Sequence, residues 1–289
     1  MFSFWELLEK SGLQKDSWWN GNSSATIFLS IGLNNFDKTQ YLTLGENSAN
    51  HVLISGCVGS GKSQLMHLVL TIAMMIYSPN EIQIYILDLK EGIEYKHYND
   101  HKLPHIRRVA AGAEREASYE ILQGIDKELA LRKEMITQNG FSSLCEYRQL
   151  EQINVPRILC IIDEFQSLFA WSDYVYSNSS IILDRLVREG STLGMHLLLS
   201  SQTLSQADDL LLETLKKITL RIAFSSNHIE EARAILADGN LAPTQLSKPG
   251  EAIYNEDSGA VQGNKHFQAA YISMDELKCY LEEISTLNK

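Results

Sequence analysis

One short segment carries a set of residues suited to binding phosphate. The sequence GCVGSGKS, residues 56–63, matches the pattern GxxxxGK[ST]. Its glycines let the backbone curl so that N–H groups face an anion. The lysine supplies a charge for the β- and γ-phosphates, the serine hydroxyl suits Mg²⁺, and a helix starting here adds its positive end. The expected nucleotide-binding residues are Gly56, Cys57, Val58, Gly59, Ser60, Gly61, Lys62, Ser63 and Gln64.

Two other groups of polar residues end apolar runs of strand length. Asp163 and Glu164 follow ILCII, and we expect Asp163 to hold Mg²⁺ through its water shell, together with Ser63. Glu164 is expected to polarise the attacking water. Gln202 follows the run MHLLLSS, and its amide can donate to phosphate or water and accept from the other. The predicted catalytic set therefore includes Lys62, Glu164 and Gln202.

These groups need a framework of alternating strands and helices, and the chain supplies one from Ala25 onward. Such alternation implies an α/β fold with a mostly parallel sheet covered on both faces. We predict one domain over residues 25–289, preceded by an extension of residues 1–24. Helices are expected at Phe4–Ser11, Leu65–Tyr77, Ala113–Gln138, Ile181–Val187 and from Asn227, three residues before Glu230, through Leu236. Strands are expected at Thr26–Ile31, Tyr41–Leu44, His51–Ile54, Ile82–Leu87, Ile158–Ile162, Met195–Leu199, Leu220–Phe224, Ala252–Tyr254 and Ala269–Ile272.

Composition limits the classes of protein that fit. The net charge of -11 argues against non-specific coating of a nucleic acid, although it leaves room for a local basic surface. None of the four cysteines forms a CxxC pair, which argues against a zinc site and favours a reducing, cytoplasmic setting. The longest apolar run, Leu65–Tyr77, is too short to span a bilayer. Membrane association through another domain or a partner stays open.

The arrangement of motifs favours one branch of the phosphate-loop proteins. An additional strand, IQIYILD, lies between the loop and the acidic strand, and a glutamate directly follows the aspartate. Both features favour ATP hydrolysis for mechanical work over kinase or small-GTPase chemistry. The sequence has no LSGGQ-like signature of transporter ATPases and no NKxD-like guanine reader, so ATP is favoured over GTP.

At this point a family resemblance becomes clear. The segments HVLISGCVGSGKS, SPNEIQIYILDLKEG, LPHI, PRILCIIDEF, LGMHLLLSSQ, ITLRIAF and ARAILAD occur in the order found in the motor domain of the FtsK/SpoIIIE DNA translocases, within the FtsK–HerA group. Asp88 and Lys90 stand where that family has Asp-x-Lys. The resemblance extends over residues 27–273, and this collinearity makes it more specific than any single motif.

The resemblance implies a RecA-like P-loop NTPase fold and a ring, usually a hexamer, of motor domains. ATP with Mg²⁺ would sit between subunits, and DNA or a polypeptide would pass through the centre. Each site would take an arginine from the neighbouring subunit to stabilise the charge of the transition state. The implied partners are further copies of the chain and double-stranded DNA. Other subunits of a larger complex, or further domains of a longer protein, are additional candidates.

The chain departs from the family pattern at the expected trans arginine. The family often has arginine three residues before the glycine of Gly-x-His, where this chain has Ser191. Arg188 lies one helical turn earlier and is the expected catalytic substitute. The family's arginine after the glutamine is also replaced, by Thr203. Further candidates for the trans arginine are Arg221, Arg233 and Arg132.

The cargo is the least defined part of the prediction. The segment KEGIEYKHYNDHKLPHIRR, residues 90–108, is a candidate for contacting DNA phosphates, but its cations are balanced by Glu91, Glu94 and Asp100. The leading hypothesis is an ATP-driven translocase of double-stranded DNA. A second is a protein-export motor, because type VII secretion ATPases share this domain. A third is a nucleotide-binding assembly module with weak ATPase activity.

Overall fold

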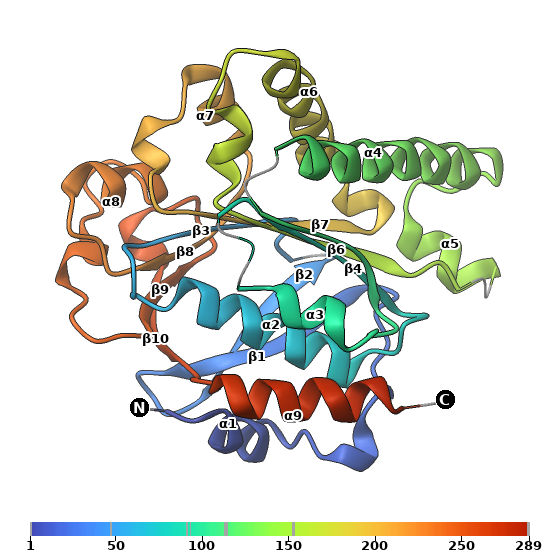
Figure 1. Ribbon diagram of the computed structural model, residues 1–289, viewed down its shortest axis with the longest axis horizontal. Helices are drawn as coiled ribbons and strands as arrows, with labels where there is room; N and C mark the ends of the chain where they lie inside the picture. Colours follow the sequence, from blue (N-terminus) through green and yellow to red (C-terminus); the bar gives the residue numbers. More distant parts are fainter. Residues whose placement is uncertain are drawn as a thin grey trace.

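A computed structural model describes residues 2–46, 48–90, 92, 94–112, 115–151 and 154–287. Its centre is one ten-stranded sheet with the strand order β2-β1-β10-β9-β8-β3-β7-β6-β4-β5 (Figure 1). The strands are β1 (Thr26–Asn34), β2 (Thr39–Gly45), β3 (Val52–Ser55), β4 (Ile82–Asp88), β5 (Ile106–Ala111), β6 (Arg157–Asp163), β7 (Met195–Ser201), β8 (Leu220–Phe224), β9 (Glu251–Asn255) and β10 (Asn264–Ala269).

The six strands from β8 to β5 in this order run parallel. The strands β9, β10, β1 and β2 extend the sheet in antiparallel fashion beyond β8. Helices cover both faces, so the predicted α/β class with a mostly parallel sheet is confirmed. The helices are α1 (Phe4–Ser11), α2 (Lys62–Ile76), α3 (Lys96–Asp100), α4 (Arg115–Gln138), α5 (Leu144–Glu151), α6 (Tyr174–Glu189), α7 (Asp209–Leu215), α8 (Ile229–Ile235) and α9 (Met274–Ser285).

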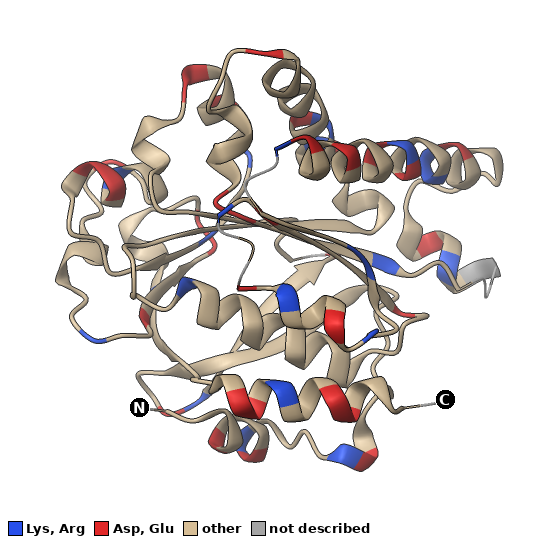
Figure 2. Ribbon diagram, in the orientation of Figure 1, with Lys and Arg blue, Asp and Glu red and all other residues tan. Residues whose placement is uncertain are grey.

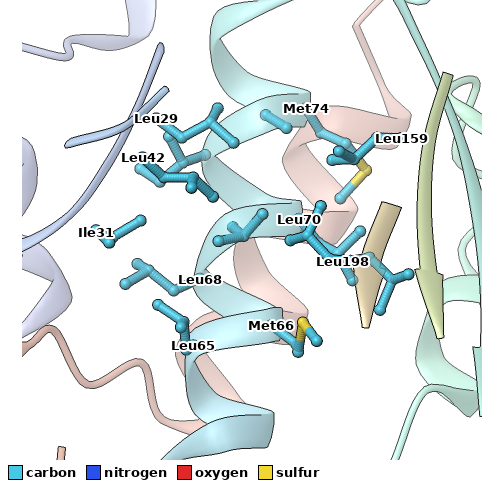
Figure 3. Close-up of a cluster of buried hydrophobic side chains, with 14 of the residues drawn as sticks. Leu29, Ile31, Leu42, Leu65, Met66, Leu68, Leu70, Met74, Leu159 and Leu198 are labelled. Carbon is cyan, nitrogen blue, oxygen red and sulfur yellow. The ribbon is translucent and has the colours of Figure 1, made fainter. Parts of the chain in front are cut away.

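Helix α2 is buried along most of its length, and most of its contacts are apolar. The sequence LMHLVLTIAMM is apolar around the whole helix, and a helix of that kind is stable only when it is buried. The antiparallel strands β1 and β2 cover one side with Leu29 and Leu42, and the parallel strands β6 and β7 cover another with Leu159 and Leu198 (Figure 3). The curled end of the sheet thus wraps around the helix that follows the phosphate loop.

The other face of the parallel sheet has its own core. Alternate residues of β7 point to opposite faces, as expected for a strand. Leu198 packs with α2, whereas Leu197 and Leu199 pack with side chains of α4 and α6. Figure 1 shows α4, α6 and α7 on this second face, while α2, α1 and α9 lie on the first.

Residues 2–24 pack closely against the rest of the fold. The expected helix Phe4–Ser11 is confirmed, and Ser3 and Glu6 form a capping box at its start. Phe4 is fully buried and its ring meets the ring of Tyr280 on α9 edge to face at 5.1 Å. The division into an extension of residues 1–24 and a domain of residues 25–289 stays a prediction.

Several predicted elements need correction. The strand expected at Ala269–Ile272 is wrong, because β10 ends at Ala269, where the chain leaves the sheet. Asn227 does not cap α8, whose N-cap is His228. The Ser226 hydroxyl bonds to the backbone of His228, and this local turn delays the helix. The helix expected over Ala113–Gln138 is observed as Arg115–Gln138, and Ala113 lies outside the described residues.

The structure also contains five elements that the sequence analysis did not predict: α3, β5, α5, α7 and α9. Strand β5 has the sequence IRRVAA and lies at the edge of the sheet, with Arg107 and Arg108 exposed. Its polar residues conceal the apolar alternation by which strands are recognised. Helix α9, in contrast, begins with a capping box of Ser273 and Glu276. A serine followed three residues later by a glutamate is a helix-start pattern that can be recognised in the sequence.

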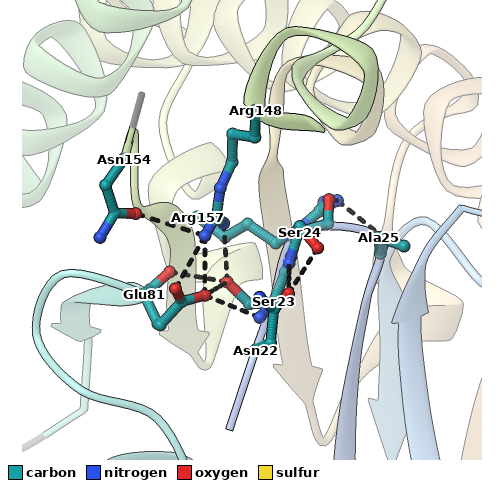
Figure 4. A network of polar contacts seen from close by, with 8 residues as sticks. All are labelled: Asn22, Ser23, Ser24, Ala25, Glu81, Arg148, Asn154 and Arg157. Atoms are coloured by element: carbon teal, nitrogen blue, oxygen red, sulfur yellow. Dashed lines mark hydrogen bonds and ion pairs between the residues drawn. The ribbon is translucent and has the colours of Figure 1, made fainter. Parts of the chain in front are cut away.

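A buried polar network links residues 22–25 to the amino ends of β4 and β6 (Figure 4). Arg148 donates to both carboxylate oxygens of Glu81 at 2.9 and 2.8 Å, and also to the Ser23 hydroxyl. Arg157 donates to the backbone carbonyls of Ser23, Ser24 and Ala25. Burial opposes ionisation of Glu81, but the hydrogen bonds from Arg148 and Ser23 outweigh it and lower the pKa of this carboxyl.

Replacing Arg148 with methionine should leave the largely buried Glu81 carboxylate without its partner. We expect the free energy of unfolding at pH 7 to fall by about 3 kcal/mol, measured by urea denaturation. Because the pKa of Glu81 is lowered in the folded chain, the wild-type advantage should be present above pH 4.5, the ordinary value, and disappear as the pH falls below it.

The matched control for this variant is Lys216→Met, which breaks an ion pair with Glu213 between side chains that are 67% and 68% exposed. This change should lower the stability by less than about 1 kcal/mol. Equal effects of the two substitutions would contradict a structural role for the Arg148–Glu81 pair.

Candidate nucleotide-binding and hydrolysis site

The phosphate loop connects β3 to α2 at the carboxyl edge of the parallel strands. Two glycines show why the sequence folds this way. Gly61 has φ +122°, a conformation that side-chain-bearing residues rarely adopt. At Gly56, a Cβ atom would lie 2.6 Å from the Cβ of Phe224, so only glycine fits beside β8. The backbone N–H groups at the start of α2 can therefore point toward an anion.

Lys62 is the first residue of α2, and its ammonium group lies within the loop. The Nζ atom donates to the backbone carbonyls of Gly56 and Cys57, the latter at 3.2 Å. The side chain is buried, and burial lowers the pKa of Lys62, while the nearby Glu164 and Asp163 carboxylates counteract this shift. This places a positive group, surrounded by loop backbone, between the phosphate loop and the acidic strand.

The acidic pair ends β6, two strands away from β3. Asp163 is buried and accepts hydrogen bonds from the hydroxyls of Ser200, at 2.7 Å, and Tyr95, at 3.3 Å. Burial raises the pKa of Asp163; the neighbouring Glu164 carboxylate raises it further, whereas the bond from Ser200 opposes the shift. Two hydroxyl donors fix both carboxylate oxygens of Asp163.

Glu164 has the left-handed backbone conformation, with φ +52°. Its side chain is held by amide donors. The Nε2 atom of Gln202 donates to Oε1, and the backbone N–H of Gln202 donates to Oε2 at 3.2 Å. The Nε2 atom of Gln166 also donates to Oε2, at 2.7 Å. The structure thus brings Gln202 and Glu164 into direct contact, and a carboxylate oriented in this way is suited to accept a proton from water.

The oxygen donors at this edge fit a Mg²⁺ ion. Strand register places Asp88 of β4 beside Asp163, and the Oδ2 atom of Asp88 is buried without a hydrogen-bond partner among the described residues. Mg²⁺ prefers one or two carboxylates, with phosphates and waters completing its shell. In the described part of the chain, no three His, Cys, Asp or Glu side chains form a metal cluster. Asp88 and Asp163 supply carboxylates at this edge, and the assignment of Ser63 and Asp163 as the residues that would hold the ion stays a prediction; a bound ion would neutralise phosphate charge.

Arg188 lies away from these groups. It is at the end of α6, next to Val187, whose carbonyl contacts His51 just before β3, at the amino edge of the sheet. Its side chain is 53% exposed and pairs with Asp184 at 2.9 Å. The structure therefore does not bring Arg188 to the phosphate loop of its own chain, and any catalytic role must be exerted on a neighbouring subunit.

Two of the other arginine candidates are held inside the fold. Arg132 is buried and donates to Glu128 and to the carbonyl of Leu193. Arg221 is buried and donates to the carbonyl of Ile235 at 2.9 Å. Both side chains stabilise the packing of their own chain, which leaves Arg188 and Arg233 as the candidates on helices with free surface.

Three residues that contact the acidic pair were not among the predicted site residues: Tyr95, Gln166 and Ser200. Ser200 becomes a neighbour of Asp163 through the β6–β7 register. Tyr95 reaches Asp163 from the segment between β4 and α3, and its ring packs at 5.1 Å from the His67 ring on α2. A serine at the end of an apolar strand is a readable signal, but nothing in the sequence around Tyr95 marks it.

The expected cargo-contacting segment carries exposed cations. The exposed cations are Lys90, Lys96, Lys102, Arg107 and Arg108, and Glu91 lies outside the described residues.

The surface helices α4 and α9 carry charges of both signs. Figure 2 shows that Lys and Arg alternate with Asp and Glu along these two helices. None of the helices within the described ranges combines the length and the apolar character needed to cross a bilayer.

Comparison with known proteins decides the family. The model of the FtsK/SpoIIIE family matches residues 10–154. The chain belongs to the FtsK/SpoIIIE family. It is 26% identical over 283 residues to the DNA translocase SpoIIIE of Bacillus subtilis, covering 93% of this chain and 34% of that protein. It is 27% identical over 176 residues to the ESX-5 secretion system protein EccC5 of Mycobacterium tuberculosis, covering 57% of this chain and 12% of that protein.

A solved structure supports the same fold for this family member. The cytoplasmic domain of the type VII secretion ATPase EccC from Thermomonospora curvata superposes with a TM-score of 0.82 at 21% identity, over 99% of this chain and 35% of that one. The expected RecA-like P-loop fold is thereby confirmed. The chain spans about a third or less of the length of these relatives.

We predict that Tyr95→Phe weakens Mg²⁺ binding without disturbing the fold, because it removes one hydroxyl donor from Asp163. Loss of a donor that orients a metal-holding carboxylate typically costs about 10-fold in metal affinity. Nucleotide binding measured across a Mg²⁺ titration should show this shift.

Tyr98→Phe serves as the control for Tyr95→Phe, because Tyr98 is equally buried but its hydroxyl bonds His67 at 2.9 Å. This variant should keep the wild-type Mg²⁺ dependence. If both variants require the same Mg²⁺ concentration as the wild type, Tyr95 does not orient Asp163.

Proposed function

We propose that this chain is an ATP-hydrolysing motor domain that works in a ring, usually a hexamer, and translocates double-stranded DNA. The observation that carries the proposal is the contact of Glu164 with Gln202 at the edge that also carries Lys62 and Asp163. A phosphate-binding loop, a metal-holding carboxylate and an oriented second carboxylate are the parts that ATP hydrolysis requires. The relationship to SpoIIIE over most of the chain supports DNA as the cargo.

In the proposed reaction each residue has one task. The loop N–H groups and Lys62 bind the β- and γ-phosphates, and Ser63 with Asp163 would hold Mg²⁺. Glu164 accepts the proton of the attacking water. In this proposal Gln202 keeps or loses its contact with Glu164 according to whether the γ-phosphate is present.

A second candidate function is protein export. The fold likeness to EccC extends over 99% of the chain, and EccC5 is named as a secretion system protein. The mixture of both charges on α4 and α9 also gives less support to DNA than a uniformly basic surface would. In this case the same site would drive a polypeptide through the ring.

The test of the leading proposal is the ATPase rate with and without double-stranded DNA. DNA should raise the wild-type rate, and Glu164→Gln should lower it by roughly 100-fold or more, because a general base contributes that much. Nucleotide binding by Glu164→Gln should be retained. The control Glu213→Gln changes a side chain that is 68% exposed and should leave the rate unchanged.

A wild-type ATPase rate that is the same with and without DNA would contradict the DNA translocase proposal and favour protein export. ATP binding without turnover in the wild type would favour the assembly-module alternative. Sizing the protein in the presence of ATP tests the ring directly, since a monomer under all conditions contradicts it.

We also propose that Arg188 acts on the neighbouring subunit's nucleotide. It is half-exposed at the edge opposite its own phosphate loop, where a neighbour could approach. Arg188→Ala should lower kcat by about 10³-fold or more, the contribution of a trans arginine in other NTPases, while ATP binding stays unchanged. The control Arg185→Ala removes an arginine of the same helix that pairs with Asp126. Equal rates in the two variants would exclude Arg188 from catalysis.

A further inference from the structure

A cleft adjoins the phosphate loop on the side away from Glu164. Its volume is about 130 Å³. The loop and α2 form one wall, and the residues just before β9, the end of β10 and the start of its connection to α9 form the other. The lining residues are Gly59, Gly61, Gln64, Pro249, Gly250, Gln268, Ala269, Ala270 and Tyr271.

The position of the cleft relative to Glu164 indicates how a bound nucleotide would be oriented. On one side of β3 lie β7 and β6, which carry Gln202 and Glu164; on the other side lie β8, β9 and β10. The cleft is on the β10 side, and the N–H of Gly250 fixes it to the loop by donating to the carbonyl of Ser60 at 2.9 Å. A nucleotide with its last phosphate toward Glu164 therefore has its base directed toward Tyr271.

We propose that this cleft is the purine subsite of the nucleotide, with the ring of Tyr271 as its stacking surface. The proposal rests on the ATP-binding function proposed above. Tyr271 is 41% exposed and lines the cleft beside the phosphate loop, so its ring is accessible to a base. Aromatic stacking suits any base face, whereas the phosphate loop recognises only the phosphates.

Polar groups at the ends of the cleft complete the subsite. The Oε1 atom of Gln64 is buried and makes no hydrogen bond to any described residue. An exocyclic amino group of adenine is the kind of donor that would satisfy it. On the opposite wall, Gln268 Nε2 donates to the carbonyls of Pro249 and Ala269, at 3.0 and 3.3 Å, which holds that wall rigid.

The start of the chain fixes Tyr271 in place. The N–H of Tyr271 donates to the carbonyl of Phe2, and the N–H of Phe4 donates to the carbonyl of Tyr271, both at 2.9 Å. Ser3 and Tyr271 thus form a short β-bridge just before the capped helix α1. By this inference residues 2–4 take part in nucleotide recognition, although they lie far from every motif.

The test compares ATP with inorganic tripolyphosphate, which carries the phosphates without base or ribose. Tyr271→Ala should bind ATP about 10-fold more weakly, the size of one base–aromatic stack. Its affinity for tripolyphosphate should equal that of the wild type. Tyr271→Phe retains the ring and should restore ATP binding. The control Tyr41→Ala removes a tyrosine of matching exposure, 42%, from β2 and should change neither affinity.

The outcomes separate the two proposals. If the wild type binds neither ligand, both the proposed phosphate site and the proposed purine subsite are contradicted. If Tyr271→Ala binds ATP as tightly as the wild type, the purine subsite is overturned while the phosphate site stands. Equal losses for ATP and tripolyphosphate would also overturn it, because they would indicate damage to the loop.

A second pair of variants tests the role of the chain start. Phe4→Pro and Phe4→Ala both remove the buried ring, but only proline removes the N–H that donates to Tyr271, and proline is tolerated at the first position of a helix. We expect Phe4→Pro to bind ATP about 3-fold more weakly than Phe4→Ala, with equal tripolyphosphate affinities. Equal ATP affinities would show that residues 2–4 do not position Tyr271.

Discussion

The burial of helix α2 is the constraint on which the rest of the structure depends. The helix is apolar around its circumference, so it has to be covered on every side, yet its first turn has to remain open to phosphate. A flat parallel sheet covers only one side of a helix. The four antiparallel strands beyond β8 resolve this by curling around α2, and α9 contributes to the remaining cover. The open end of α2 is then left at the carboxyl edge of the parallel strands.

This arrangement also determines where the chemical groups meet. The strands β3, β7, β6 and β4 are parallel neighbours, so the residues at their ends form one row across the sheet. Lys62, Gln202, Asp163 and Asp88 come from distant parts of the sequence but enter the row from adjacent strand ends. The contact of Asp163 with Ser200 follows from this register. The same geometry places Arg188 at the other edge, away from the phosphate loop of its own chain.

Much of this could be predicted from the sequence because the relevant signals are local. The phosphate loop, the acid pair and the buried strands each combine composition with spacing. The α/β fold and the buried strands are confirmed, and the roles of the loop and of the acid pair stay predictions. What failed depends on tertiary context. Strand β5 is concealed by exposed arginines at a sheet edge, and β10 owes its bounds to pairing with β9. Tyr95, which contacts Asp163, and Tyr271, which lines the cleft beside the loop, come from connecting segments, so their positions can be known only when the order of the strands is known.

The left-handed backbone at Glu164 has a consequence for the stability of the whole domain. A non-glycine residue in this conformation costs roughly 1–2 kcal/mol. Beside it, Asp163 and Asp88 are carboxyls whose pKa is raised by burial, so ionising them at neutral pH is harder in the folded chain than in the unfolded one. The carboxyl edge of the parallel strands, with Glu164, Asp163 and Asp88, therefore lowers the free energy of unfolding of the domain. A glycine in place of Glu164 would relieve the backbone but remove the proposed base, so at this position greater thermal stability and turnover exclude each other.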